Sequence, residues 1–147
     1  MSNSYTFIGG GNMGRALIGG LISSGYPKAS INVLDKAAAS RDACAQQFGV
    51  KVFESNTQAI EGSQAIILAT KPKDVEEVCK ELYRHKIDNT LIISIAAGIT
   101  CTQLENWLGD ETAIIRAMPN TPALIGLGIT GMFANKNVHP PKKHLGK

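Results

Sequence analysis

The sequence predicts an α/β fold in which a doubly wound, mainly parallel sheet carries helices on both faces. Two observations lead to this prediction. Short apolar, β-rich runs alternate with helical patterns along the chain, as in βαβ units, whose crossover helices cover a parallel sheet. The length of 147 residues suits a single domain with a proper core.

The expected strands are apolar runs that lie between the helical patterns. They cover residues 5–8, 31–34, 50–53, 65–69, 91–95, 113–116 and 129–133. The run 65–69 is apolar throughout, which is typical of a central strand that is buried on both faces. It therefore predicts the middle of the sheet.

The expected helices cover about residues 13–24, 40–48, 57–61, 74–84 and 102–108. In the first of them, the residues that recur at helical spacing and predict a buried face are Met13, Ala16, Leu17, Gly20, Leu21 and Ser24. Gly25 and Gly49 are expected to end the first two helices. Thr102 and Glu105 form a T-x-x-E pattern, which predicts a capping box at the start of the last.

A glycine loop, with the pattern G-x-G-x-x-G, follows the first strand and opens the first helix. It consists of Gly9, Gly10, Gly11, Asn12, Met13 and Gly14. The first glycine of this pattern permits a tight turn, the second lets a pyrophosphate approach the backbone, and the third lets helix and strand pack closely. In this context the loop predicts a Rossmann-type fold that binds a dinucleotide at a helix N-terminus.

Asp35 ends the second strand, close to the spacing expected of an acid that hydrogen-bonds the adenosine ribose. On its own it favours NAD(H). Lys36, Ser40 and Arg41 follow, and such cations and hydroxyls suit the 2′-phosphate of NADP(H). The residues leave open both cofactors, and also a solvated Asp35–Lys36 pair without a ligand.

Composition excludes several other classes of function. Lys142, Lys143 and Lys147 account for the formal charge of +3, so nucleic-acid binding by a basic face is not expected. The chain has no apolar stretch long enough to cross a membrane and no secretory signal, so a soluble, cytoplasmic protein is expected. The three cysteines are expected to be reduced and structural, the histidines His85, His139 and His144 to be solvated, and no metal site is expected.

Four segments together resemble one family. They are Phe7–Gly14, Thr70-Lys71-Pro72, Ser94-Ile95-Ala96-Ala97-Gly98 and Ile115–Pro122, the last of which contains M-P-N-T-P. In this order they resemble the N-terminal half of pyrroline-5-carboxylate reductase, over nearly all of residues 5–138. The resemblance implies an NAD(P)H-dependent reduction of the C=N bond of 1-pyrroline-5-carboxylate to L-proline, the last step of proline biosynthesis.

The resemblance also implies a set of site residues. Those near the cofactor are Asn56, Ala69, Thr70, Lys71, Pro72, Ala96, Ala97 and Gly98, and those at the rim of the active site are Asn120 and Thr121. Family members carry an apolar residue such as Val where Thr70 stands. Four of these assignments have a purely structural alternative: Lys71 as a solvated loop cation, Pro72 as a strand terminator, Asn56 as a helix N-cap, and residues 118–122 as a rigid turn.

The resemblance divides the chain into an NAD(P)-binding domain, residues 1–138, and a tail or linker remnant, residues 139–147. It implies a further helical domain, which forms a homo-oligomer and supplies the substrate loop, and which is missing from this sequence. Two alternatives follow: a cofactor-binding module with no catalysis of its own, or another reductase of the same fold, such as a β-hydroxyacid dehydrogenase relative.

Overall fold

The protein is described by a computed structural model. The described residues are 4–23, 25–54, 60, 62–85, 90–96, 98–109, 112–116 and 133–134. The expected helix at 57–61 falls outside this set except for Ile60, and the expected strand at 129–133 falls outside it except for Phe133.

One sheet contains every described strand. The strands are β1 (Tyr5–Ile8), β2 (Ile31–Leu34), β3 (Lys51–Phe53), β4 (Ala65–Leu68), β5 (Leu91–Ser94), β6 (Ala113–Arg116) and β7 (Phe133–Ala134). Their order across the sheet is β3-β2-β1-β4-β5-β6-β7; the first six strands run parallel, and β7 pairs antiparallel with β6. The expected doubly wound, mainly parallel sheet is confirmed.

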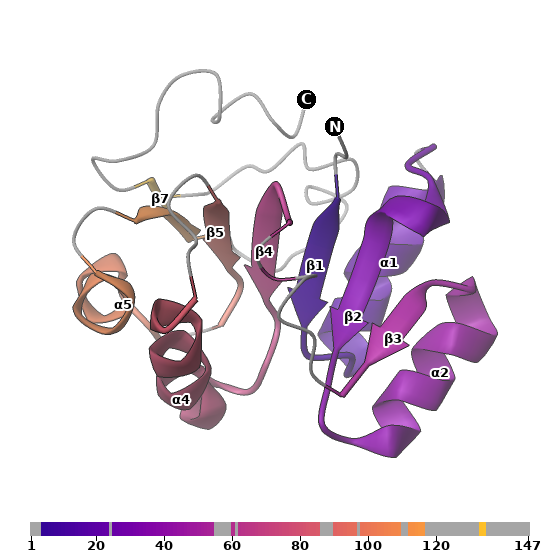
Figure 1. Cartoon of the computed structure of the whole chain (residues 1–147), viewed down its shortest axis with the longest axis horizontal. Helices are drawn as coiled ribbons and strands as arrows, with labels where there is room; N and C mark the ends of the chain where they lie inside the picture. The colour runs from indigo at the N-terminus through magenta and orange to yellow at the C-terminus, as the bar shows by residue number, and fades with distance from the viewer. Residues whose placement is uncertain are drawn as a thin grey trace.

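Helices cover both faces of this sheet (Figure 1). They are α1 (Asn12–Ser23), α2 (Ala38–Phe48), α4 (Pro72–Tyr83) and α5 (Cys101–Leu108), with a 3₁₀ turn at Lys28–Ser30. One core joins α1 and α2 to alternate strand residues such as Phe7 and Ile67. A second core joins α4 and α5 to the intervening residues, such as Ile66 and Leu68. All four residues of β4 are buried, as expected for a central strand.

The order in which the chain adds strands to the sheet reverses at β1. This strand pairs with β2 on one side and with β4 on the other. In both pairings Ile8 is the last residue of β1, level with Leu34 of β2 and with Leu68 of β4. The carboxyl ends of these three strands are therefore level at the switch point. In open α/β sheets, ligands bind in the crevice beyond this edge.

The buried face of α1 differs from the expected one by about one position. Leu17 and Leu21 are buried as predicted, but Met13 is 39% exposed and Ala16 is also exposed. Gly14 and Ile18 take their places in the core. The reason lies in the first turn, where α1 approaches β1 through the glycine rather than through the large Met13 side chain.

Glycines end two helices, as predicted. The Gly25 N–H donates to the Ile22 carbonyl and the Tyr26 N–H to the Leu21 carbonyl, which is the Schellman pattern of a left-handed C′ residue. Gly49, with a φ of 72°, closes α2 in the same conformation.

The starts of two elements differ from the predicted ones. Helix α2 begins at Ala38 rather than at residue 40, and β3 begins at Lys51 rather than at residue 50.

The capping box of α5 lies two residues before the predicted one. Thr100 is the N-cap: its Oγ1 accepts a hydrogen bond from the Gln103 N–H at 3.1 Å, and the Gln103 side chain accepts from the Thr100 N–H at 2.9 Å. Thr102, which was expected to be the cap, lies inside the first turn and is exposed. T-x-x-Q and T-x-x-E overlap here, and the sequence pattern alone favours the wrong one.

We expect Thr100→Ala to lower the free energy of unfolding by about 1 kcal/mol, because the Gln103 N–H loses its acceptor. Thr102→Ala, the matched control in the same helical turn, is expected to change it by less than about 0.5 kcal/mol. Urea denaturation of the two variants measures both values. A larger loss for Thr102→Ala would place the cap at the residue that the sequence pattern favours.

None of the helices in the described part of the chain combines the length and the apolar character needed to span a membrane.

Candidate cofactor site

The glycine loop leaves β1 at the switch point, and the structure gives each of its key glycines a different environment. Gly9 has a φ of +106°, and a Cβ there would lie 2.8 Å from the Ala69 carbonyl group. A Cβ on Gly14 would lie 2.5 Å from the Gly9 carbonyl oxygen. A Cβ on Gly11, by contrast, would meet no described atom within 4 Å. The protein itself thus requires glycine at positions 9 and 14, whereas the backbone of Gly11 lies open for a ligand.

Helix α1 begins directly after this open position. Its first turn contains no acidic residue, and its first backbone N–H groups have no acceptor within the helix. These N–H groups and the helix dipole together favour an anion such as a phosphate. The free space at Gly11 and the unopposed positive end of α1 therefore fit the pyrophosphate of a dinucleotide.

The Asp35 carboxylate holds the glycine loop in place. Its Oδ2 accepts a hydrogen bond from the Gly10 N–H at 2.7 Å, and its Oδ1 accepts one from the Ala37 N–H at 2.8 Å. The carboxylate is thereby fixed in orientation, and each oxygen retains a lone pair that could accept a ribose hydroxyl. The sequence predicted only the ribose contact and not the bond to Gly10.

Three cations lie around Asp35, and each has a protein partner. Arg41 Nη1 donates to the carbonyl oxygens of Asp35 at 2.9 Å and of Lys36 at 3.1 Å. Lys36 Nζ lies 3.7 Å from a carboxylate oxygen of Glu77 on α4. Arg15 Nη1 donates to the Gly10 carbonyl oxygen at 3.0 Å. The sequence patterns did not predict that Arg15 contacts the glycine loop. Its position directly after the last glycine of the pattern is the only signal that could have indicated it.

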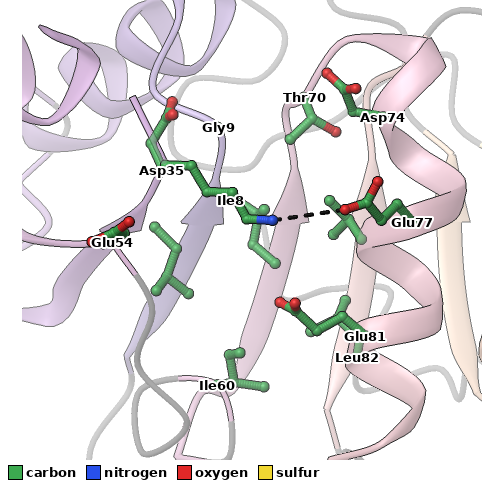
Figure 2. Close-up of a pocket in the computed structure, with 13 residues that line it drawn as sticks. Ile8, Gly9, Asp35, Glu54, Ile60, Thr70, Asp74, Glu77, Glu81 and Leu82 are labelled. Carbon is green, nitrogen blue, oxygen red and sulfur yellow. Dashed lines mark ion pairs between the residues drawn. The ribbon is translucent and has the colours of Figure 1, made fainter. Parts of the chain in front are cut away.

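A pocket of about 310 Å³ opens beside these loops, between the ends of β1 and β2 and helix α4 (Figure 2). Its walls include Gly9, Asp35 and Thr70 at the carboxyl ends of three strands. The pocket lies on the α4 side of the sheet, lined there by Val78 and Leu82. Since it reaches from Asp35 to the loop after β4, it has the place and size to receive the adenosine end of a dinucleotide.

The segments expected near the nicotinamide follow the next two strands. Ala69 donates from its N–H to the Ile8 carbonyl oxygen at 2.8 Å, which joins the loop after β4 to the glycine loop. After β5, Ala96 is buried and Gly98 adopts a φ of +80°. The Ile95 N–H donates to Leu68 at the end of β4, so the two segments meet at one edge of the sheet.

The loop after β4 differs in detail from its expected role. Pro72 is the first residue of α4, where its missing N–H costs nothing, and Lys71 is the exposed N-cap. Pro72 thus starts a helix that was predicted to begin at residue 74. The Oγ1 of Thr70 is buried, and no hydrogen-bond partner for it is found among the described residues. Buried hydroxyls are nearly always paired, so this oxygen is a candidate contact for a bound ligand or water.

Several predicted site residues lie outside the described part of the chain: Asn56, Ala97, Asn120 and Thr121. The same is true of the Asn12 side chain, although its backbone begins α1, and of the tail at residues 139–147. The placement of Asn56, Ala97, Asn120 and Thr121 in the site stays a prediction from the resemblance, and that of Asn12 a prediction from the glycine pattern.

The cysteines show no sign of a catalytic thiol. Burial raises the pKa of Cys79 to about 12, and burial is also the main cause of the raised pKa values of Cys44 and Cys101. All three thiols are therefore protonated near neutral pH and poor nucleophiles. Among the described residues, no group of His, Cys, Asp and Glu side chains is arranged to hold a metal ion.

Comparison with known proteins agrees with this geometry. Residues 4–98 match the family described as NADP oxidoreductase coenzyme F420-dependent. A pyrroline-5-carboxylate reductase of Pseudomonas aeruginosa is 44% identical over 132 residues, which cover 90% of this chain and 48% of that protein.

Two solved structures add to the comparison. A pyrroline-5-carboxylate reductase of Coxiella burnetii superposes with a TM-score of 0.86 at 37% identity, covering 99% of this chain and 54% of that one. The pyrroline carboxylate reductase of Plasmodium falciparum, solved with NADP bound, gives 0.79 at 26% identity over 97% and 53%.

The chain spans about half the length of the relatives it matches. The predicted resemblance to the N-terminal half of pyrroline-5-carboxylate reductases is confirmed, and the expected nicotinamide dinucleotide agrees with the family's description. By the match over residues 4–98, the chain belongs to the family of NADP oxidoreductases described as coenzyme F420-dependent.

Proposed function

We propose that this chain is the NAD(P)H-binding domain of a pyrroline-5-carboxylate reductase, which reduces 1-pyrroline-5-carboxylate to L-proline. The observation that carries the cofactor part is the open backbone at Gly11, placed between a β-strand and the free N-terminus of α1. The names of the relatives support the substrate part.

In this proposal the residues of the chain position the cofactor. Gly11 and the first N–H groups of α1 bind the pyrophosphate, and Asp35 accepts a hydrogen bond from the adenosine ribose. Residues 69–72 and 96–98 orient the nicotinamide at the edge where β4 and β5 end. The bound reduced nicotinamide supplies the hydride, so the protein's task is to hold it against the imine carbon and to exclude water.

The proposed domain covers residues 1–138, with residues 139–147 as a linker toward a helical domain such as the relatives' additional length would provide. We propose that Asn120 and Thr121 lie at the rim of the active site and that Asn56 and Ala97 contact the cofactor. The reduced thiols of Cys44, Cys79 and Cys101 suit a cytoplasmic enzyme. Its partners are the small-molecule substrate and a second copy of the protein, without nucleic acid.

A chimera tests both parts of the proposal. We expect the 147-residue chain to bind NADH or NADPH, measured by the fluorescence of the reduced nicotinamide. Joined after Val138 to the C-terminal half of the Pseudomonas aeruginosa relative, it is expected to consume the cofactor when 1-pyrroline-5-carboxylate is added. Binding without turnover in a folded chimera would reject the substrate. Failure of the chain to bind either cofactor would reject the cofactor site as well.

A further inference from the structure

The pocket beside Asp35 has a strongly one-sided charge. Among the described residues, the ionisable ones that line it are five carboxylates and a single ammonium group: Asp35, Glu54, Asp74, Glu77, Glu81 and Lys36. Asp35 lies on the sheet side, while Asp74, Glu77 and Glu81 lie on α4 across the pocket (Figure 2). A ligand that brings further negative charge into this space is repelled by both walls.

Lys36, the single cation among the described lining residues, is paired with one of these carboxylates. Lys36 Nζ lies 3.7 Å from Glu77 Oε1, and the ion pair marked in Figure 2 spans the pocket from the loop after β2 to α4. Arg41 is not among the residues that line the pocket, and its Nη1 donates to two backbone carbonyls. Of the cations that the sequence offers for a 2′-phosphate, Lys36 is thus the one whose ammonium group pairs with Glu77 instead.

We propose that Glu77 is a specificity-determining residue of the cofactor site, which lowers the affinity for the 2′-phosphorylated cofactor by pairing with Lys36 and by adding charge to the pocket wall. The inference rests on the proposed cofactor function. NADH and NADPH differ only in the 2′-phosphate, which lies next to the residues that follow β2. Removal of the Glu77 charge therefore leaves NADH binding nearly unchanged and strengthens NADPH binding.

The chain offers a matched control one residue away. Glu76 has the same charge on the same helix, but it pairs with Lys80 at 2.7 Å and is not among the lining residues. Glu77→Gln and Glu76→Gln change the net charge equally and remove a charge from nearly the same position along the helix dipole. A difference between the two variants therefore reports the pocket rather than the overall charge of the protein.

The experiment measures the dissociation constants of NADH and NADPH for the 147-residue chain and for both variants at low ionic strength. Both Glu77 and Lys36 are mostly exposed, so we expect a modest shift: Glu77→Gln moves the affinity ratio toward NADPH about 3- to 5-fold. Glu76→Gln leaves the ratio within about 1.5-fold, since exposed charges away from the ligand contribute little. The gain of Glu77→Gln is expected to shrink at high salt and in a Lys36→Gln background.

Equal ratios in Glu77→Gln and Glu76→Gln would overturn the inference. A gain of the same size when Lys36 is replaced would overturn the role assigned to the Lys36–Glu77 pair. Neither result contradicts the proposed function as long as the unmodified chain binds one of the two cofactors. If the unmodified chain binds neither NADH nor NADPH, the proposed function itself fails, and the two failures are distinguished by the unmodified chain alone.

Discussion

Gly11→Ala is expected to weaken the binding of NADH and NADPH about 30- to 150-fold while leaving the stability of the protein nearly unchanged. The new methyl group would meet no described atom within 4 Å, and Gly11 is not among the glycines with a positive φ. The free energy of unfolding should therefore change by less than about 0.5 kcal/mol. Binding suffers because the methyl group occupies the space of the pyrophosphate, at the cost of one or two charge-assisted hydrogen bonds, about 2–3 kcal/mol.

Two titrations of the same variant decide this prediction, one with urea and one with reduced cofactor. A loss of binding accompanied by an equal loss of stability would mean that Gly11 serves the fold and not the ligand. Unchanged binding in a stable variant would contradict the placement of the pyrophosphate at the start of α1.

Gly9→Ala is expected to show the opposite pattern, with a loss of about 2–5 kcal/mol in the free energy of unfolding. An alanine there is forced into a φ of +106°, which costs about 1–2 kcal/mol for a residue with a Cβ. Its Cβ would also lie 2.8 Å from the backbone carbonyl group of Ala69, and relief of such overpacking costs about a further 1–3 kcal/mol.

Gly98→Ala separates these two contributions. Gly98 also has a positive φ, +80°, but a Cβ there would meet no described atom within 4 Å. Only the backbone cost remains, so a loss of about 1–2 kcal/mol is expected. Urea denaturation compares the two variants, and losses of equal size would show that the contact of Gly9 with Ala69 contributes nothing.

The sequence predicted the sheet well because its buried strands consist almost entirely of apolar residues. The apolar runs at Tyr5–Ile8, Ile31–Leu34 and Ala113–Arg116 have the bounds that were expected. Buried parallel strands need apolar side chains on both faces, and such runs stand out in any sequence. Helix ends closed by Gly25 and Gly49 were equally clear, since few other residues adopt a left-handed conformation.

The sequence was less informative where two local solutions compete. Thr100 and Thr102 both stand three residues before a side chain that can complete a capping box, and only the path of the chain after β5 selects Thr100. Likewise, spacing alone placed Met13 on the buried face of α1, whereas the close approach of Gly14 to Gly9 turns Met13 outward. Tertiary contacts decide both cases.

The candidate site shows the same limit. Spacing identified Asp35 as a ribose acceptor, but no sequence pattern states that its second oxygen binds the Gly10 N–H. Similarly, Lys36 was interpreted as a cation that is available to a phosphate, because its partner Glu77 lies on α4, far along the chain. Pairings of this kind depend on the sheet order, which brings α4 opposite the loop after β2.

The glycine loop is contiguous in sequence, yet its shape depends on distant segments. The Gly9 N–H is bound by the Leu34 carbonyl oxygen, the Ile8 carbonyl oxygen accepts from Ala69, and Gly9 packs against Ala69 itself. A growing chain that has not yet completed β4 therefore lacks one wall of this loop. The cofactor site is in this sense a product of long-range assembly: the motif that opens the chain reaches its final geometry only after the strand that begins at Ala65 has taken its place beside β1.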